Sequence, residues 1–374
     1  MSLSKSTASI AALSVSAFSM PTDLPEADGT FEWQRTVLVT VELTGGGERG
    51  FGYTYADEAT AKVIESALAE VVLGADAFAI PALRAAMRRK VRNIGSRGVA
   101  AMAISAVDTA LWDLKARVLG VPLLALLGAR REKVAAYGSG GFTSYSLEQL
   151  EQQLAGWAKQ GLRRVKMKVG SDPTRDPERV GAARAAIGDE VELFVDANGA
   201  YSRKLALALA EQFAEQHVIW FEEPVSSDDL AGLRLLRDRA PAAMDIAAGE
   251  YGYDSAYFAR MLGKGAVDVL QADATRCGGV SGFLEAATLA DTAGLPLSAH
   301  CAPSLHGVLG CACERVRHVE YFHDHARIEG DWFDGGLTPQ AGELVPDRTR
   351  AGLGFWLVSE RAAPHRIATA SKGR

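Results

Sequence analysis

Phe194-Val195-Asp196-Ala197-Asn198-Gly199 is an apolar run that closes on a carboxylate, and the recurrence of this pattern decides the fold. Polar landmarks follow one another at intervals of 20 to 28 residues, most of them closing a similar run: Lys168, Asp196, Glu222, Glu250, Asp273, His300 and Glu320. One strand, one helix and their loops take about 30 residues or fewer. Charged groups at the same end of successive parallel strands converge at the mouth of a barrel. In enzymes built on parallel barrels, the active site lies at this end.

The last two thirds of the chain alternate short strands with helices. The candidate strands are 133–137, 164–168, 192–196, 218–222, 245–249, 267–271, 296–299 and 317–320. Eight strands separated by mostly helical segments favour a closed (β/α) barrel over an open doubly wound sheet. No Gly-x-Gly-x-x-Gly follows a strand to open a helix, so the sequence gives no support for a dinucleotide-binding fold.

The first third of the chain is typical of an α+β unit. Strands are expected at 9–19 and 35–43, with a hairpin-type turn at Gly45-Gly46-Gly47. The segment from Pro21 to Gly29 carries two prolines and three acids, which predicts an exposed loop. Helical patterns follow at 58–73, 80–92 and 98–119, and Phe355 to Val358 is a possible last strand.

Composition excludes several classes of function. The chain is 48% hydrophobic and 23% charged with a net charge of −6, which indicates a soluble protein and gives no sign of a nucleic-acid partner. No apolar run of about 18 residues predicts a membrane span. The spacing of the cysteines, Cys277, Cys301, Cys311 and Cys313, fits neither a disulfide framework nor a zinc knuckle, so reduced thiols and a cytoplasmic location are expected.

Three carboxylates at neighbouring strand ends predict a metal site. Asp196, Glu222 and Glu250 would repel one another strongly unless a cation joined them. Oxygen donors without cysteine or histidine suit Mg²⁺, which keeps open positions for substrate oxygens. The competing interpretation is that the three acids are solvated side chains at strand ends. Their occurrence at the same position on three successive strands disfavours this interpretation. Glu223 follows Glu222, and strand alternation is expected to point it away from Glu222. Its expected role is to support the metal site structurally.

Two lysines and a histidine are the candidate proton-transfer groups. Lys166 and Lys168 are two residues apart on one strand and therefore share a face. If that face lines the barrel, burial and mutual repulsion lower their pKa and make one of them a base; the alternative is an exposed basic strand. Asp273 can hold one imidazole nitrogen of His300 and leave the other for proton transfer.

The remaining polar residues near these strand ends have weaker predictions. Glu320 ends the last barrel strand and could hydrogen-bond a substrate carboxylate or a developing oxyanion. Cys301 could be mistaken for a nucleophile but is better explained as a small apolar residue beside the site. His306 lies in the following loop and is expected to be incidental.

Taken as a set, these residues resemble those of the enolase superfamily, in its mandelate-racemase-like subgroup. The resemblance covers about residues 30 to 335 and rests on Lys166-x-Lys168, Asp196, Glu222, Glu250, Asp273, His300 and Glu320. Further similar motifs are Val195-Asp196-Ala197-Asn198-Gly199, Glu222-Glu223-Pro224, Cys277-Gly278-Gly279-Val280 and Asp108-Thr109-Ala110-Leu111-Trp112-Asp113-Leu114-Lys115. Relatives that use lysine on both sides of the substrate would have lysine where Asp273 stands.

The resemblance implies an α+β capping domain over a modified (β/α)7β TIM barrel. Residues 1–130 would form the cap, residues 131–335 the barrel, and residues 336–374 would return to the cap. It also implies a homo-oligomer that binds Mg²⁺ and removes the proton α to the carboxylate of a small-molecule substrate. Lys166 and the metal would hold that carboxylate, while Lys168 or His300 takes the proton.

The expected outcome is dehydration of an acid sugar to a 2-keto-3-deoxy acid. A racemase or epimerase of an α-hydroxy acid, or a sugar-lactone cycloisomerase, would use the same residues, and a catalytically inactive scaffold is disfavoured because no landmark is missing. Specificity is expected from two cap segments, Ser19 to Thr30 and about Gly50 to Tyr55. The first carries Asp23, Glu26 and Asp28, which fits a hydroxyl-rich substrate and argues against a second substrate carboxylate there. Arg276 could contact the distal end of the substrate.

Overall fold

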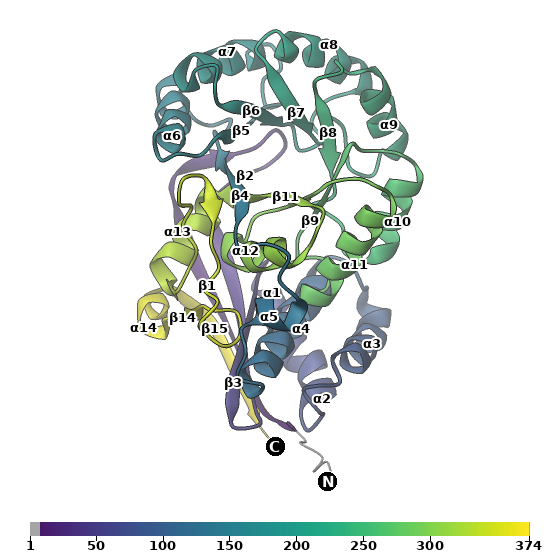
Figure 1. Ribbon diagram of the computed structural model, residues 1–374, viewed down its shortest axis with the longest axis vertical. Coiled ribbons are helices and arrows are strands. Elements are labelled where there is room, and N and C mark those ends of the chain that lie inside the picture. The colour runs from purple at the N-terminus through teal and green to yellow at the C-terminus, as the bar shows by residue number, and fades with distance from the viewer. Residues whose placement is uncertain (1–7, 374) are drawn as a thin grey trace.

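The computed structural model describes residues 8–373 and places a closed parallel barrel beside an α+β cap (Figure 1). The barrel strands are β4 (Val134–Gly140), β5 (Arg164–Lys168), β6 (Glu192–Asp196), β7 (Val218–Glu222), β8 (Asp245–Ala248), β9 (Val269–Ala272), β10 (Leu297–Ala299) and β11 (Val316–Phe322). They pair in chain order, and β11 closes the ring by pairing in parallel with β4. The predicted barrel is therefore confirmed, with β5, β6 and β7 at the predicted residues.

The strand register brings the polar landmarks to one end of the barrel. Lys168 pairs with Asp196, and Asp196 pairs with Glu222, in adjacent parallel strands. Below them the interior is filled by a cluster that includes Tyr137, Phe194 and Trp220, all fully buried. A barrel packed in this way presents its polar residues at the carboxyl ends of the strands.

Seven helices, one after each of the first seven strands, cover the outside of the barrel in the part of the chain that the structure describes (Figure 1). They are α6 (Leu147–Lys159), α7 (Asp176–Ile187), α8 (Arg203–Ala214), α9 (Leu230–Arg239), α10 (Ser255–Gly263), α11 (Gly279–Thr292) and α12 (Pro303–Ala312). The helix after β11, α13 (His323–Trp332), turns to the cap: the Trp332 ring lies 5.9 Å from Phe18, and Glu329 accepts hydrogen bonds from Tyr53 and Tyr55. This altered last helix agrees with the expected modified barrel.

The cap is a four-stranded antiparallel sheet in the order β15-β1-β2-β3, packed against helices. Its strands are β1 (Ile10–Ala27), β2 (Glu32–Gly45), β3 (Glu48–Tyr55) and β15 (Arg366–Gly373). Its helices are α1 (Ala59–Val63), η1 (Ile64–Leu68), α2 (Ala69–Val72), α3 (Ile80–Val91), η2 (Arg92–Ile94), α4 (Val99–Val118) and α5 (Leu123–Leu127). Because β15 pairs with β1, the end of the chain completes the cap sheet, and we propose the division at residues 130 and 335 on that basis.

The segment between β12 and β15 is largely irregular. It contains β12 (Phe333–Asp334), β13 (Glu343–Leu344), β14 (Trp356–Leu357), α14 (Ser359–Ala362) and η3 (Ala363–His365). The possible strand near Phe355 is thus present in shortened form as β14, which pairs with β12. Within residues 8–373, none of the helices is long and apolar enough to cross a bilayer. A cytoplasmic location and a homo-oligomeric state stay predictions.

The segment from Pro21 to Gly29 is exposed at Pro21 and from Asp23 to Pro25, as expected, but the prediction that it forms a loop is wrong. Strand β1 continues through this segment, and Glu26 pairs with Trp33 of β2 and lies buried. The prolines stand at the edges of an irregularity in register between Pro21 and Glu26, where proline interrupts the ladder because it has no N–H to donate. The chain reverses after Asp28, whose side chain accepts the Phe31 N–H.

Two aspartates of α4 fix the cap, one to the barrel and the other to the C-terminal segment. Asp108 accepts hydrogen bonds from the backbone and hydroxyl of Ser281 on α11. Asp113 accepts the N–H groups of Phe51 and Leu353, at 2.7 Å and 2.6 Å, and so joins β3 to the C-terminal segment. The family-like stretch from Asp108 to Lys115 is therefore a docking element that fixes the cap over the barrel mouth.

Candidate active site

The three predicted metal ligands converge at the barrel mouth. Asp196 ends β6, Glu222 ends β7, and Glu250 stands two residues after β8. One carboxylate oxygen of each lies within 4.8 Å of the others, and all three residues are buried. Burial and the Asp196 carboxylate together raise the pKa of Glu222 to about 8. The three carboxylates therefore lie close enough to repel one another strongly when they are ionised.

Lys166 and Lys168 face the barrel interior, as expected, and the exposed-strand alternative is excluded. Lys166 Nζ lies 2.6 Å from Glu222 Oε1 and 2.9 Å from Glu320 Oε1, while Lys168 Nζ lies 2.5 Å from Asp196 Oδ2. The predicted lowering of their pKa is wrong in direction. Burial acts to lower both values, but Glu222 and Glu320 raise the pKa of Lys166 and Asp196 raises that of Lys168.

Asp273 and His300 form the expected pair. Asp273 follows β9 and His300 follows β10, and the two meet with His300 Nδ1 2.9 Å from Asp273 Oδ2. The other ring nitrogen, Nε2, lies 3.2 Å from Glu250 Oε2. Burial acts to lower the pKa of His300, but Cys301, Glu250 and Glu320 raise it well above its usual value. The imidazole thus bridges the aspartate and one member of the carboxylate trio.

Glu320 of β11 closes the ring of polar groups. The Ser139 hydroxyl donates to its Oε1 at 2.5 Å, and the Cys301 N–H donates to its Oε2 at 3.2 Å. Burial acts to raise its pKa, but Lys166 outweighs this effect and holds the value below its usual range. Glu320 is therefore an ionised acceptor fixed by three neighbours.

Three weaker predictions can be compared with the structure. Burial raises the pKa of the Cys301 thiol, which lies 3.3 Å from His300 Nε2, so it is no thiolate nucleophile at neutral pH. His306 lies on α12 and not in the expected loop, and its ring accepts the Ala274 N–H and so supports the backbone after β9. Glu223 does not point away from the site. With φ at 38° it leaves the strand alternation, and burial together with Glu250 raises its pKa well above normal.

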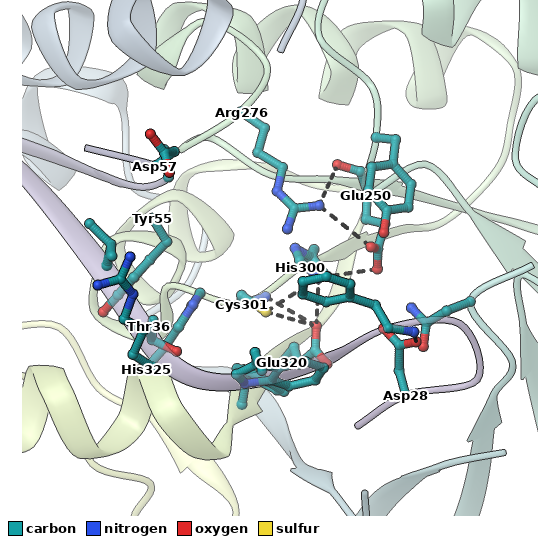
Figure 2. Close-up of a pocket in the computed structure, with 18 of the residues that line it drawn as sticks. Asp28, Thr36, Tyr55, Asp57, Glu250, Arg276, His300, Cys301, Glu320 and His325 are labelled. Carbon is teal, nitrogen blue, oxygen red and sulfur yellow. Dashed lines mark hydrogen bonds and ion pairs between the residues drawn. The ribbon is translucent and has the colours of Figure 1, made fainter. Parts of the chain in front are cut away.

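A cavity of about 830 Å³ opens above these groups, between barrel and cap (Figure 2). Lys168, Glu250, His300 and Glu320 line its base. Its other walls comprise Asp28, Phe31, Glu32, Trp33, Gln34, Arg35, Thr36, Val37, Tyr55, Ala56, Asp57, Asn198, Tyr251, Arg276, Cys301, Phe322 and His325. Figure 2 shows Arg276 beside Glu250, with Thr36, Tyr55 and His325 gathered on the other side. The cavity is therefore a polar chamber with four of the eight predicted site residues at its floor, whereas Lys166, Asp196, Glu222 and Asp273 lie outside its lining.

Sequence reasoning missed much of the cap wall. Asp28 and Tyr55 line the cavity as expected, but Asp23 and Glu26 lie outside the lining that residues 8–373 provide. The wall comes instead from the start of β2, including Arg35, a cation that the acidic-loop argument did not foresee. Strand alternation could not have found this wall, because residues 32–37 of β2 all line the cavity.

His325 is a second residue that the sequence did not reveal. The Ala302 N–H donates to its Nδ1 at 3.2 Å, which leaves the ring proton on Nε2. Its ring stacks on Tyr55, with centroids 3.3 Å apart, and burial holds its pKa well below the usual value. His325 is therefore a neutral hydrogen-bond donor in the cavity wall.

The carboxylate trio fits a divalent cation. Three oxygen donors without nitrogen or sulfur are the set that Mg²⁺ prefers. A cation held there would remove the repulsion that raises the pKa of Glu222, and it would compete with the lysine ammonium groups for the same oxygens.

Comparison with known proteins decides the family. The description "Mandelate racemase / muconate lactonizing enzyme, N-terminal domain" matches residues 11–128, and "Enolase C-terminal domain-like" matches residues 149–361. The chain belongs to the enolase superfamily. Its motifs and relatives place it in the mandelate racemase-like subgroup of that superfamily, as the sequence resemblance predicts.

Several members of the superfamily are similar to this chain. L-talarate/galactarate dehydratase from Salmonella typhimurium is 34% identical over 87% of this chain and 81% of that enzyme. A mutant of an L-talarate/galactarate dehydratase, solved with Mg and L-glucarate, has a TM-score of 0.90 at 30% identity, over 98% of this chain and 93% of that chain. D-galactarolactone cycloisomerase from Agrobacterium fabrum is 31% identical over 75% of each chain. A mandelate racemase/muconate lactonizing enzyme-like protein from Rubrobacter xylanophilus is 52% identical with a TM-score of 0.94, over 96% of this chain and 100% of that one.

Proposed function

We propose that this enolase-superfamily protein removes the proton α to a carboxylate with the help of Mg²⁺, and that it dehydrates an acid sugar to a 2-keto-3-deoxy acid. The observation that carries the proposal is the presence of two proton-transfer groups at one cavity floor. Lys168 contacts Asp196, whereas His300 contacts Glu250. The two proton-transfer groups therefore lie beside different carboxylates of the trio. A substrate carboxylate held at the trio would present its α-carbon between them.

Each step of the dehydration has a residue to perform it. Lys168 or His300 takes the α-proton, according to which face of the substrate carries it. Each must first lose its own proton, which a cation at the trio would favour because it would offset the Asp196 and Glu250 charge that raises the pKa of Lys168 and of His300. Lys166 supplies positive charge beside the substrate carboxylate as negative charge develops there, which stabilises the transition state more than the ground state. Mg²⁺, when bound to Asp196, Glu222 and Glu250, supplies further positive charge at the same carboxylate.

Loss of water completes the reaction. Protonated His300 donates a proton to the β-hydroxyl, the carbon–oxygen bond breaks, and the resulting enol becomes the 2-keto acid on taking a proton at the β-carbon. Asp273 favours this donor role because its carboxylate stabilises the protonated imidazole through Nδ1. Glu320, kept ionised by Lys166, is placed to accept a hydrogen bond from the substrate end that lies near β11.

The polar cavity and the relatives both support an acid sugar as substrate. Asp28, Asp57, Arg276 and the Nε2–H of His325 offer partners for hydroxyl groups. The similar Salmonella enzyme is named for talarate and galactarate, and a mutant of an enzyme with the same name has been solved with L-glucarate. Arg35 in the wall supports a diacid as well as a monoacid.

A second candidate function is cycloisomerisation of a sugar lactone, or epimerisation. It is supported by the similarity to D-galactarolactone cycloisomerase, because the same two proton-transfer groups would serve. The substrate then decides the outcome: without a β-hydroxyl leaving group, returning the proton on the opposite face inverts the α-carbon.

The deciding experiment is a screen of mono- and diacid sugars and their lactones with Mg²⁺. We expect formation of a 2-keto acid from at least one acid sugar, detected as its semicarbazone. Exchange of the α-proton with deuterated solvent, together with a change in optical rotation and no keto acid, would support the racemase or epimerase. Absence of both exchange and turnover across the whole screen would refute the proposal.

A further inference from the structure

A second group of acidic and imidazole side chains lies where the end of β1 meets α13. We call it the Asp23 cluster, and it consists of Asp23, Glu26, His323 and Asp324. His323 Nε2 lies 3.1 Å and 3.0 Å from the two Asp23 carboxylate oxygens. Single donor atoms of Asp23, Glu26 and His323 lie within 4.8 Å of one another. The cluster joins the cap to the barrel and shares no residue with the carboxylate trio.

Two of its carboxyl groups are buried and have oxygens without a hydrogen-bond partner among the described residues. Glu26 and Asp324 are each 1% exposed. Both oxygens of Glu26 and Oδ1 of Asp324 lack a hydrogen-bond donor among residues 8–373. Carboxyl groups buried in this way are costly unless a proton or a cation sits between them.

The charges around the cluster do not balance. Three carboxylates face one guanidinium, that of Arg327, whose Nη1 lies 3.1 Å from Asp23 Oδ1. If all three carboxylates are ionised, they carry two more negative charges than the one guanidinium can balance. A divalent cation would neutralise this excess. The Asp23 side chain is 47% exposed and that of His323 is 19% exposed, so a cation can enter from solvent.

We propose that Asp23, Glu26 and His323 form a second metal site, completed by the neighbouring Asp324, which takes a divalent transition-metal cation such as Zn²⁺. One imidazole nitrogen with carboxylate oxygens is a donor set typical of Zn²⁺, whereas Mg²⁺ prefers oxygen alone. Binding there brings together side chains of β1 and of α13, which are far apart in the chain.

The site would also hold the wall of the substrate cavity. Asp324 Oδ2 accepts hydrogen bonds from Trp33 Nε1 at 3.2 Å and from the Thr36 hydroxyl at 2.6 Å. Trp33 and Thr36 both line the cavity. A cation at the Asp23 cluster would therefore position this part of β2, and its loss should raise KM more than it lowers kcat.

The test is a zinc titration of the metal-stripped, full-length protein, followed by calorimetry in excess Mg²⁺. We expect the wild type to bind about one equivalent of Zn²⁺ more than His323→Asn and Asp23→Asn. His217→Asn is the matched control, because His217 is an exposed histidine just before β7 and should leave the stoichiometry unchanged. Glu250→Gln separates the two sites, since it should weaken binding at the trio and keep the equivalent at the Asp23 cluster.

Two results would overturn the proposal. Equal zinc stoichiometry in wild type, His323→Asn and Asp23→Asn would mean that Glu26 and Asp324 share a proton only. Crystals of the wild type soaked in Zn²⁺ provide a test that does not depend on a variant's folding. Anomalous scattering at the zinc edge should give a peak between Asp23 and His323, and a peak at the trio alone would refute the site. Neither result depends on turnover, so failure here is distinct from failure of the proposed reaction.

Discussion

Replacement of His300 by asparagine should separate proton abstraction from loss of water. The imidazole contacts Asp273 through Nδ1 at 2.9 Å and Glu250 through Nε2 at 3.2 Å. Asparagine can keep one polar contact but cannot transfer a proton. A general acid or base contributes about 10²- to 10⁴-fold in rate, which corresponds to roughly 3–5 kcal/mol of activation free energy. We expect the upper end for dehydration, because His300 would serve the departing hydroxyl whichever group takes the α-proton.

The reactive face of the substrate provides the sharper readout. With the isomer whose α-proton faces Lys168, His300→Asn should keep exchange with deuterated solvent, measured by proton NMR, while keto-acid formation falls. Lys168→Ala should lose both exchange and keto-acid formation with that isomer, and should keep both with the opposite isomer, whose α-proton faces His300. Calorimetry should find Mg²⁺ binding retained in both variants, since neither residue is one of the three proposed ligands. His217→Asn serves as the control, and wild-type turnover in both active-site variants would refute the two-base site.

Three further predictions follow from the contacts around the site. Asp113→Ala leaves the buried Phe51 and Leu353 N–H groups without their acceptor, so urea unfolding should show a loss of ~2–6 kcal/mol, against little change for the exposed Asp238→Ala; equal effects would contradict the docking role. Mg²⁺ at 100 times its Kd should stabilise the wild type by about 2.7 kcal/mol in thermal melting, and chelation with EDTA should abolish turnover. Stabilisation of the same size in Glu250→Gln would argue against the trio as the metal site. Burial raises the pKa of Glu329 from 4.5 to about 7, so its proton stabilises the fold fully below pH 4.5, and roughly 3 kcal/mol is lost as the pH rises through 7. Glu329→Gln should therefore flatten the decline of unfolding free energy between pH 5 and pH 8, and an unchanged slope would show that other groups dominate it.

The barrel could be predicted from the sequence because its signals are local. Each strand is a short apolar run that ends on a charged residue, and parallel pairing brings such ends together whatever the intervening helices contain. The strands that carry Lys168, Asp196 and Glu222 were predicted at their observed residues. The spacing of the polar residues along the chain also located the candidate site, because residues at the ends of successive parallel strands lie together at one end of the barrel.

The cap wall could not be predicted in the same way. Pro21 and Pro25 indicated a loop, yet pairing with β2 carries the strand past both and buries Glu26. The side chains that face the cavity, among them Arg35 and His325, are selected by how the cap docks on the barrel. That docking depends on contacts between residues far apart in the chain, such as Asp108 with Ser281.

The sequence by itself determined the fold, the family and the residues at the cavity floor, because regular strand ends encode position directly. Tertiary structure alone decided the protonation of those residues and the shape of the cavity. The lysines illustrate the reason: two adjacent cations suggest lowered pKa values, but acids supplied by three other strands surround them and reverse the shift. Electrostatic potential at a buried group sums over all its neighbours in space, and most of those neighbours are distant in the chain.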